Sequence, residues 1–283
     1  GTSVIQDNET WPTAGDGSEE ASGSVKYYTK DYISEEMVGD IRGMWPLYGS
    51  GSIANGTNNI DDASVKSSEV TAKNANGTGM AYVSGVRGTA IDFDGTDDYL
   101  CTDTNDDDTC DDDSDLNITG SITVGAWIKT SGATSRDAIL SDYNEAGDPA
   151  SYIGYTLEVA ASNSNKAFFR VGNNTTTDYK AVSSTALNDG NWHHVVGVFN
   201  TSGNPIYIYI DGRLEATATG PSSISSSTEP LLVGSSDSVR NFFDGTIDEP
   251  FVTATALSAS QIKNMYNIGY RALQSHSSTA LGG

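Results

Sequence analysis

Residues 88–100 read Gly-Thr-Ala-Ile-Asp-Phe-Asp-Gly-Thr-Asp-Asp-Tyr-Leu, and this stretch decides the fold class. Ile91 and Phe93 alternate with polar residues, which is the pattern of a half-buried strand. Asp94-Gly95 then supplies a tight-turn signal before a second apolar pair, Tyr99-Leu100. The stretch therefore predicts two short strands joined by a turn, which is typical of an all-β protein.

Five other stretches in a fixed order carry similar signals. They lie at residues 43–47 (Gly-Met-Trp-Pro-Leu), 121–130, 191–199, 206–212 and 244–249. The pair Asp211-Gly212 is a strong hairpin signal between two of the expected strands. Across the chain we expect strands near 43–47, 79–84, 88–93, 97–101, 121–129, 137–142, 152–160, 166–172, 178–184, 192–200, 205–211, 213–219, 230–234 and 244–253. Trp45, Trp127 and Trp192 occupy apolar strand positions and are expected to pack in the core.

In this order and spacing, the six stretches resemble the laminin-G-like, concanavalin A-like jelly-roll family over about residues 41–268. The resemblance implies a β-sandwich of two antiparallel sheets whose last strand is followed by a short helix. It also implies a protein that binds or assembles more often than it catalyses.

The closing helix is expected at residues 257–269. Ser258 and Gln261 form a capping box at its start. Ile262, Met265 and Tyr266 give its buried stripe, and Gly269 is predicted to end it. The jelly roll would then occupy residues 41–269 and leave 270–283 as a polar tail.

Residues 1–40 read as an extended, polar N-terminal arm with one strand-competent segment at 24–33. Val25, Tyr27, Thr29 and Ile33 fall on one face of that segment, although Asp31 interrupts the alternation. A strand outside a complete sandwich could add to a sheet edge of another copy, and repeated addition would give a filament. The alternative is that the segment folds back onto its own sheet.

Composition limits the partners. The formal net charge is −23, which argues against binding nucleic acid or anionic membranes and is compatible with divalent cations. No apolar stretch is long enough to span a bilayer, so we expect no membrane insertion. An acidic surface that only keeps the protein soluble is an equally good interpretation of the charge.

Two features favour an extracellular or cell-surface location. Cys101 and Cys110 are nine positions apart and are expected to form a local disulfide in an exported protein. Seven Asn-x-Ser/Thr sequons also occur, although chance alone gives about four or five in a chain this rich in Ser and Thr. They are Asn8, Asn55, Asn76, Asn117, Asn173, Asn174 and Asn200.

The loop from Cys101 to Asp115 is the sharpest local anomaly, because it carries eight aspartates. Carboxylates at this density repel one another unless a hard cation neutralises them. Asp103, Asn105 and Asp107 match the opening of a calcium loop, and Asp111 falls at its ninth position. We predict calcium here, with Asp113 as a further ligand. The loop resembles thrombospondin type 3 repeats, but it lacks the glycine and the closing glutamate of an EF-hand, and a solvated acidic insertion is the alternative.

A second calcium position follows only from the family resemblance. Members often hold an ion near the Phe-Asp-Gly loop and the last strand, which here implies Asp94 and Asp248. The alternative is that Asp94 shapes a turn and Asp248 makes local hydrogen bonds.

Catalysis is not predicted. Glycosidases on this fold place paired carboxylates on one strand, and their E-x-D-x-x-E arrangement is absent. Glu158 stands alone on its strand, and Glu249 precedes a proline. His193 and His194 face opposite sides of a strand, so they are poorly placed to bind one metal or to form a triad.

Two functions therefore remain. The first is a non-catalytic, calcium-stabilised extracellular protein that acts in adhesion or self-assembly. The alternative is a lectin-like module that binds surface glycans or proteins. Tyr207 and Tyr209 share one strand face and could stack on a sugar, as could Tyr143 and Tyr152, which we expect in loops.

Overall fold

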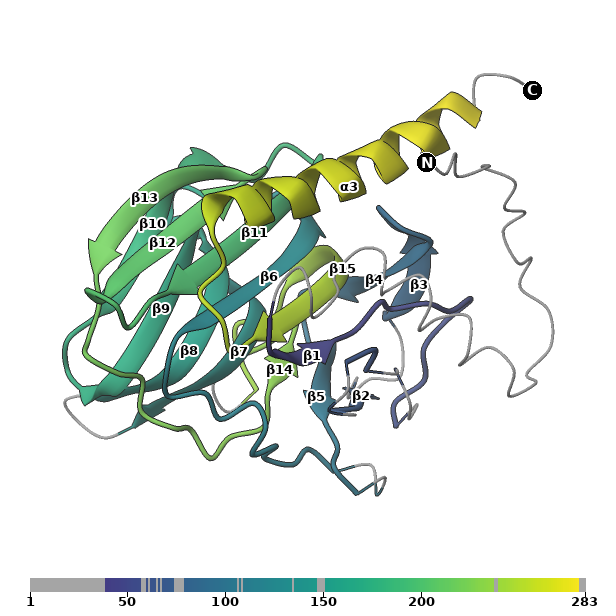
Figure 1. Cartoon of the computed structure of the whole chain (residues 1–283). Coiled ribbons are helices and arrows are strands. Elements are labelled where there is room, and N and C mark those ends of the chain that lie inside the picture. The colour runs from purple at the N-terminus through teal and green to yellow at the C-terminus, as the bar shows by residue number, and fades with distance from the viewer. Residues whose placement is uncertain are drawn as a thin grey trace, which may run out of the picture.

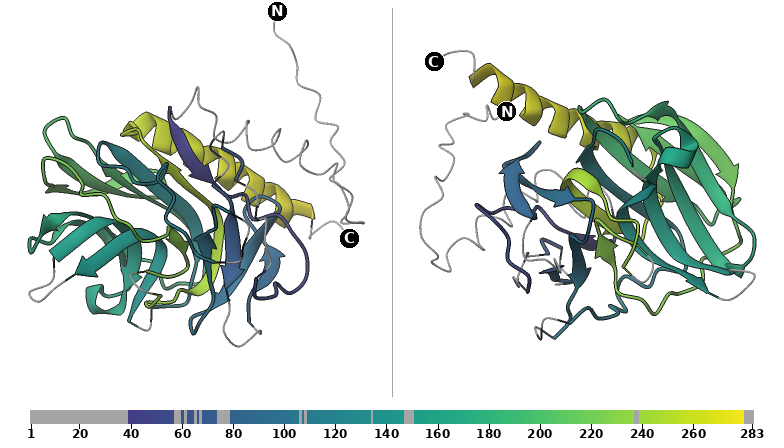
Figure 2. Two further views of the ribbon diagram at one scale, coloured as in Figure 1. Left: turned by 90° about the horizontal axis from the view of Figure 1, so that it is seen from below. Right: turned by 180° about the vertical axis from the view of Figure 1, so that it is seen from behind.

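The computed structural model describes residues 39–279, apart from 57–59, 61, 65, 67, 74–78, 106, 108, 134, 147–150 and 237–238. These residues form a β-sandwich of two antiparallel sheets with one helix against it (Figures 1 and 2). The predicted fold class is confirmed. Residues 1–38 of the predicted arm (1–40), including the segment at 24–33, lie outside the described residues, and assembly through it stays a prediction.

Sheet A has eight strands. In spatial order they are β13 (Arg213–Thr219), β12 (Pro205–Ile210), β11 (Trp192–Phe199), β6 (Ile122–Lys129), β15 (Asp244–Thr253), β4 (Thr89–Asp94) and β3 (Ala81–Ser84), with β1 (Ile41–Met44) also paired to β15. The decisive stretch at 88–100 supplies β4 to this sheet. Its second half crosses to the other sheet, so the two predicted strands do not pair with each other.

Sheet B has seven strands. In spatial order they are β10 (Tyr179–Ala186), β9 (Lys166–Thr175), β8 (Ser151–Ala160), β7 (Arg136–Ala146), β14 (Leu232–Val233), β5 (Tyr99–Thr102) and β2 (Val70–Lys73). One turn of 3₁₀ helix, Ala161–Asn163, joins β8 to β9. Every predicted strand is found within a few residues of its expected position. The strand β2 was not predicted, although its run Val-Thr-Ala-Lys alternates apolar and polar residues and Asn76-Gly77 follows it in the sequence.

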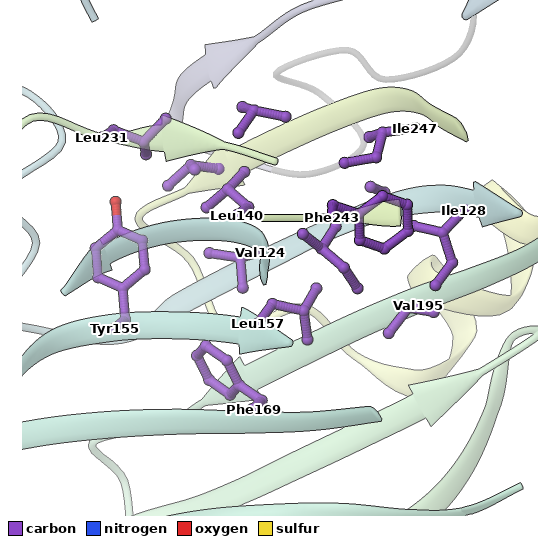
Figure 3. Close-up of a cluster of buried hydrophobic side chains, with 14 of the residues drawn as sticks. Val124, Ile128, Leu140, Tyr155, Leu157, Phe169, Val195, Leu231, Phe243 and Ile247 are labelled. Carbon is purple, nitrogen blue, oxygen red and sulfur yellow. The ribbon is translucent and has the colours of Figure 1, made fainter. Parts of the chain in front are cut away.

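The core lies between the two sheets. Figure 3 shows Val124, Ile128 and Val195 of sheet A facing Leu140, Leu157 and Phe169 of sheet B. Alternate residues of each strand point inward, as their two-residue period requires. Trp45 lies in this core, whereas Trp192 is only half-buried, so the core prediction is wrong for Trp192.

The helix α3 (Ala259–Thr279) packs on the outer face of sheet A. Ile262 and Met265 are buried there against Val196, Val198 and Tyr209. Its start is the predicted capping box, in which the Ser258 N–H donates to Gln261 Oε1 at 2.9 Å and the Gln261 N–H donates to Ser258 Oγ at 3.3 Å. In Figure 1 the helix is the yellow element that runs along one side of the sandwich.

The predicted end of the helix at Gly269 is wrong, because α3 continues to Thr279. Gly269 instead allows the helix to approach Trp127 of β6. A Cβ atom on Gly269 would lie 2.6 Å from Cζ2 of the Trp127 ring. The glycine is therefore needed for close packing, a role that sequence spacing alone does not distinguish from a helix stop. Among the described residues, no helix is long and apolar enough to cross a membrane.

Replacing Gly269 by valine is expected to lower the free energy of unfolding by about 1–3 kcal/mol, because the added side chain pushes α3 away from Trp127. Urea unfolding of the two proteins measures this difference. Gly120→Ala is the matched control, since a Cβ atom there meets nothing within 4 Å. Equal stability of wild type and Gly269→Val would mean that α3 is not tightly packed here.

Candidate functional site

The Asp-rich loop brings three of its predicted calcium ligands together. Cys101 and Cys110 form the predicted disulfide, which closes the loop. Asp103, Asp107 and Asp111 each place one carboxylate oxygen within 4.8 Å of the others. Such an all-oxygen donor set fits a hard cation such as calcium.

Two other predicted ligands of this loop are engaged elsewhere. Asn105 accepts a hydrogen bond from the Asp107 N–H at 3.1 Å, which stiffens the turn beside the three carboxylates. Asp113 accepts a hydrogen bond from the Asp115 N–H at 2.9 Å and is not a member of the group. Hydrogen bonds from the side chain and backbone of Thr109 lower the pKa of Asp107, so it stays ionised as a ligand must.

The second acidic group consists of Asp94, Asp97 and Asp98, at the end of β4. Asp98 is closed to solvent, and this burial raises its pKa to about 6. A Cβ atom on the facing Gly79 would lie 2.9 Å from one oxygen of both Asp94 and Asp98, so only glycine leaves this space open. Asp94 also accepts a hydrogen bond from the Thr96 N–H, which shapes the turn.

Asp248 does not join this group. In the ladder between β15 and β4, Asp94 lies opposite Asp244, which places Asp248 four residues further along the strand. Its carboxylate accepts hydrogen bonds from the N–H groups of Val86 (2.7 Å) and Arg87 (3.1 Å), and burial raises its pKa to about 7. The structure therefore separates the two positions that the family resemblance coupled, and Asp248 holds the turn between β3 and β4.

Sequence reasoning missed several buried carboxylates, among them Asp62, Asp137 and Asp142. Asp142 on β7 is 2% exposed, and its Oδ1 atom has no hydrogen-bond partner. Burial raises its pKa to about 8, and the charges of Asp112 and Glu229 raise it further. In the sequence Asp142 is an ordinary aspartate in a strand, so no local signal marks it.

The outer face of sheet B carries a cluster that the sequence did not reveal. Inward residues of β9 are Ala167, Phe169 and Val171, so Phe168 and Arg170 point to the outer face. Three cationic groups lie over the Phe168 ring, within 6 Å of its centroid: Arg136 at 5.9 Å, Arg170 at 5.2 Å and Lys180 at 5.5 Å. We call these four residues the Phe168 cluster. Cations over an aromatic face are attracted by its quadrupole.

Two carboxylates neutralise part of this charge. Glu158 is fully buried and accepts two hydrogen bonds from Arg136, at 2.6 and 2.7 Å. Asp178 accepts from Arg170 at 2.7 Å and from Lys180 at 2.6 Å. Glu145 also lies 3.6 Å from Arg136 and balances the third cation.

Two tyrosines extend the cluster toward β7 and β8. Arg170 also lies over the rings of Tyr143 (5.6 Å) and Tyr152 (5.1 Å), which stack on each other at 6.2 Å. Tyr143 is buried beneath this layer, whereas Tyr152 is half-exposed. Tyr143 and Tyr152 are strand residues, not loop residues as predicted. The result is a polar sheet face with an aromatic floor and a charged, partly exposed upper layer, which suits a hydroxyl-rich ligand.

Sheet A offers no comparable face for Tyr207 and Tyr209. Both belong to the hydrophobic cluster beneath α3, and Tyr209 is only 5% exposed. Tyr209 supports the helix and is closed to a sugar, whereas Tyr207 is half-buried against this cluster.

The two histidines face opposite sides of the strand, as predicted, and their surroundings differ. His193 bonds to Asp211 at 3.0 Å and to Asp189 at 3.2 Å, and the Asp211 carboxylate raises its pKa. His194 is buried between Trp127 and Tyr266, and neither ring nitrogen has a hydrogen-bond partner. Neither forms part of a metal group among the described residues.

The sequons vary in accessibility. Asn55 and Asn174 are exposed, while Asn117, Asn173 and Asn200 are half-buried. The Asn117 side-chain amide donates to Asp112 at 2.8 Å. Asn8 and Asn76 lie outside the described residues, and glycosylation of all seven sequons stays a prediction.

Residues 94–263 match a laminin-G family model, which represents the concanavalin A-like lectin/glucanases superfamily. No curated protein sequence matches the chain.

Many solved structures share its fold, among them two toxin binding domains and an arabinanase domain. The binding domain of Paraclostridial mosquitocidal protein 1 aligns with a TM-score of 0.59 and 12% identity, over 82% of this chain and 53% of that one. Domain 4 of AbnA, an extracellular GH43 arabinanase of Geobacillus stearothermophilus solved with arabinotriose, aligns with a TM-score of 0.56 and 17% identity, over 80% of this chain and 98% of that one. The binding domain of botulinum neurotoxin DC, solved with SialylT, aligns with a TM-score of 0.54 and 15% identity, over 77% of this chain and 50% of that one. The chain thus spans about half of each toxin structure and nearly all of the arabinanase domain.

Proposed function

The chain belongs to the concanavalin A-like lectin/glucanase superfamily, and on this basis we propose that it is a non-catalytic, extracellular module that binds surface glycans on the outer face of sheet B. The observation that carries the proposal is the arrangement of Tyr152, Arg170 and the rest of the Phe168 cluster on that face. The helix α3 packs on the opposite sheet. Charged planar groups beside aromatic rings recognise sugar hydroxyls and ring faces together.

The carboxylates on this face support binding over hydrolysis. A glycosidase needs two carboxyl groups that flank the scissile bond, one of them free to transfer a proton. Glu158 is instead tied to Arg136 and also accepts a hydrogen bond from Thr156 at 3.0 Å. Asp178 is held by Arg170 and Lys180. The solved neighbours include two toxin binding domains and domain 4 of an arabinanase solved with arabinotriose, which supports the same conclusion.

A glycan array tests the proposal, with wild type compared with Tyr152→Ala. We expect wild type to bind at least one glycan, and the variant to lose about 1–2 kcal/mol of binding free energy through the lost ring contact. Tyr270→Ala is the control, because Tyr270 is 44% exposed on α3, far from sheet B in the fold. An array without any bound glycan, or equal losses in both variants, would count against this face.

We further propose that calcium stabilises the module through the Asp-rich loop. Asp103, Asp107 and Asp111 supply the convergent oxygens, and the disulfide limits how far they can separate. The bound ion would offset the repulsion among the loop carboxylates. Asp94, Asp97 and Asp98 form the second candidate position.

Adding calcium at a hundredfold excess over its Kd is expected to raise the free energy of unfolding by about 2.7 kcal/mol. The double variant Asp107→Asn, Asp111→Asn should lose most of this gain in a thermal melt, and Asp94→Asn tests the second position in the same way. Asp112→Asn, in the same loop but outside the group, is the control. A melt that calcium leaves unchanged would contradict the calcium proposal.

A further inference from the structure

The distribution of charge on the molecule is uneven. The chain has 38 acidic and 15 basic residues in total. Three of those bases meet over one ring in the Phe168 cluster, where three carboxylates, Glu158, Asp178 and Glu145, face them. Lys166 adds a further cation on the same face of β9, two residues before Phe168. This part of sheet B is therefore locally positive on a strongly acidic protein.

A ligand close to this face is influenced mainly by the charges of the face and much less by the net charge of the protein. At physiological ionic strength the Debye length is about 8 Å, so distant carboxylates are largely screened while groups in the cluster are not. An anionic ligand in solution would be repelled by most of the surface and attracted over a short range to this face. That contrast gives specificity for where an anion binds.

Several of these cations are partly accessible to solvent. The side chain of Arg136 is 25% exposed and that of Lys180 is 29% exposed, whereas that of Arg170 is only 7% exposed. Arg240 extends the positive rim and is 54% exposed. The face therefore has one buried cation over the aromatic floor, two half-buried cations (Arg136 and Lys180) and one exposed cation (Arg240) that a ligand can contact.

The rim already holds one carboxylate between two guanidinium groups. Glu145 Oε2 lies 3.2 Å from Nη2 of Arg240 and 3.6 Å from Nη1 of Arg136. Guanidinium groups favour carboxylates because their planar donors match the two oxygens. Glu145 thus shows that the spacing of these two arginines accommodates a carboxylate.

We propose that this face selects glycans that carry carboxylate groups. The inference rests on the proposed function and adds a ligand class to it. A uronate or sialate carboxylate would contact Arg240, Arg136 or Lys180, while the sugar ring lies against Tyr152. Neutral glycans would make the ring contact alone and bind more weakly.

Titration calorimetry with hexagalacturonate, and with the matched neutral galactose hexamer obtained by carboxyl reduction, tests this selection. We expect the acidic hexamer to bind about 10-fold or more tightly than the neutral one, with the affinity falling as salt is raised. The double variant Lys180→Gln, Arg240→Gln should remove most of the preference. Arg271→Gln, which neutralises an exposed arginine on α3, is the matched control and should keep it.

The outcomes separate the two proposals. Equal binding of both hexamers, with loss on Tyr152→Ala, would overturn the selection for carboxylates and leave glycan binding intact. A preference that survives in Lys180→Gln, Arg240→Gln would also overturn it. Binding of neither hexamer would overturn the present inference, while the glycan array decides the broader function. Circular dichroism of each variant confirms that a lost preference does not arise from unfolding.

Discussion

Replacing Arg136 by methionine is expected to lower the free energy of unfolding by about 3–5 kcal/mol. The reason is Glu158, a carboxylate with no exposed surface whose two oxygens accept from Nε and Nη2 of Arg136 at 2.6 and 2.7 Å. Without the guanidinium group, Glu158 must stay buried without its charged partner, take up a proton, or move to water. Urea unfolding at neutral pH measures the loss.

The double variant Arg136→Met, Glu158→Met is the control for this interpretation. A buried ion pair replaced by apolar residues is often close to neutral in stability, whereas breaking it by removing one partner is costly. We therefore expect the double variant to recover most of the loss. If Arg136→Met alone costs less than about 1 kcal/mol, the pair behaves as an exposed surface ion pair and the described floor of the site is wrong.

Lowering the pH from 7 to 4 is expected to remove about 3 kcal/mol of stability through His194 alone. Burial beneath α3 lowers the pKa of His194 to about 4. In the unfolded chain the imidazole takes up a proton below about pH 6.5, but in the folded protein it stays neutral until about pH 4. The folded-state pKa is the lower one, so stability falls as pH falls through this window.

Other groups titrate in the same range, so the effect must be measured as a difference. The raised pKa of His193 and the raised pKa values of Asp142 and Asp248 act in the opposite direction, since each favours the folded state as pH falls. These other contributions are expected to be the same in the variant His194→Phe, which keeps an aromatic ring between Trp127 and Tyr266. The difference in unfolding free energy between wild type and His194→Phe should therefore change with pH. A constant difference would show that His194 is not held neutral.

The strands could be predicted from the sequence because their signals are local. Alternation of apolar residues and Asp-Gly turns located every strand except β2 (Val70–Lys73). The helix start was equally local, since Ser258 and Gln261 form a capping box within one turn. The end of the helix could not be predicted locally, because Gly269 is required for close packing against Trp127, which lies on a strand distant in sequence.

The acidic groups were predictable in part. Clustering in sequence correctly brought Asp103, Asp107 and Asp111 together, and the disulfide closes their loop. The family resemblance placed Asp94 and Asp248 at one site, but the ladder of β4 and β15 keeps them four residues apart. Asp94 instead meets Asp97 and Asp98, which follow it directly in the chain.

The outer face of sheet B could not be predicted from one sequence. Arg136, Arg170 and Lys180 come from three strands, and each occupies an ordinary polar position. The register brings them together, since Lys180 lies opposite Arg170 and Glu158 lies opposite Phe168. One local signal exists. Phe168 interrupts the polar side of β9, between Lys166 and Arg170, and an aromatic residue at such a position indicates a partner on that face.

A crystal structure of the protein with the glycan that binds most tightly on the array would show where the sugar lies. We expect the sugar on the outer face of sheet B, with a ring against Tyr152 and polar contacts to Lys180 or the rim arginines. A glycan bound instead at the Asp103–Asp107–Asp111 loop or along α3, with the face of β7 to β10 unoccupied, would contradict this expectation.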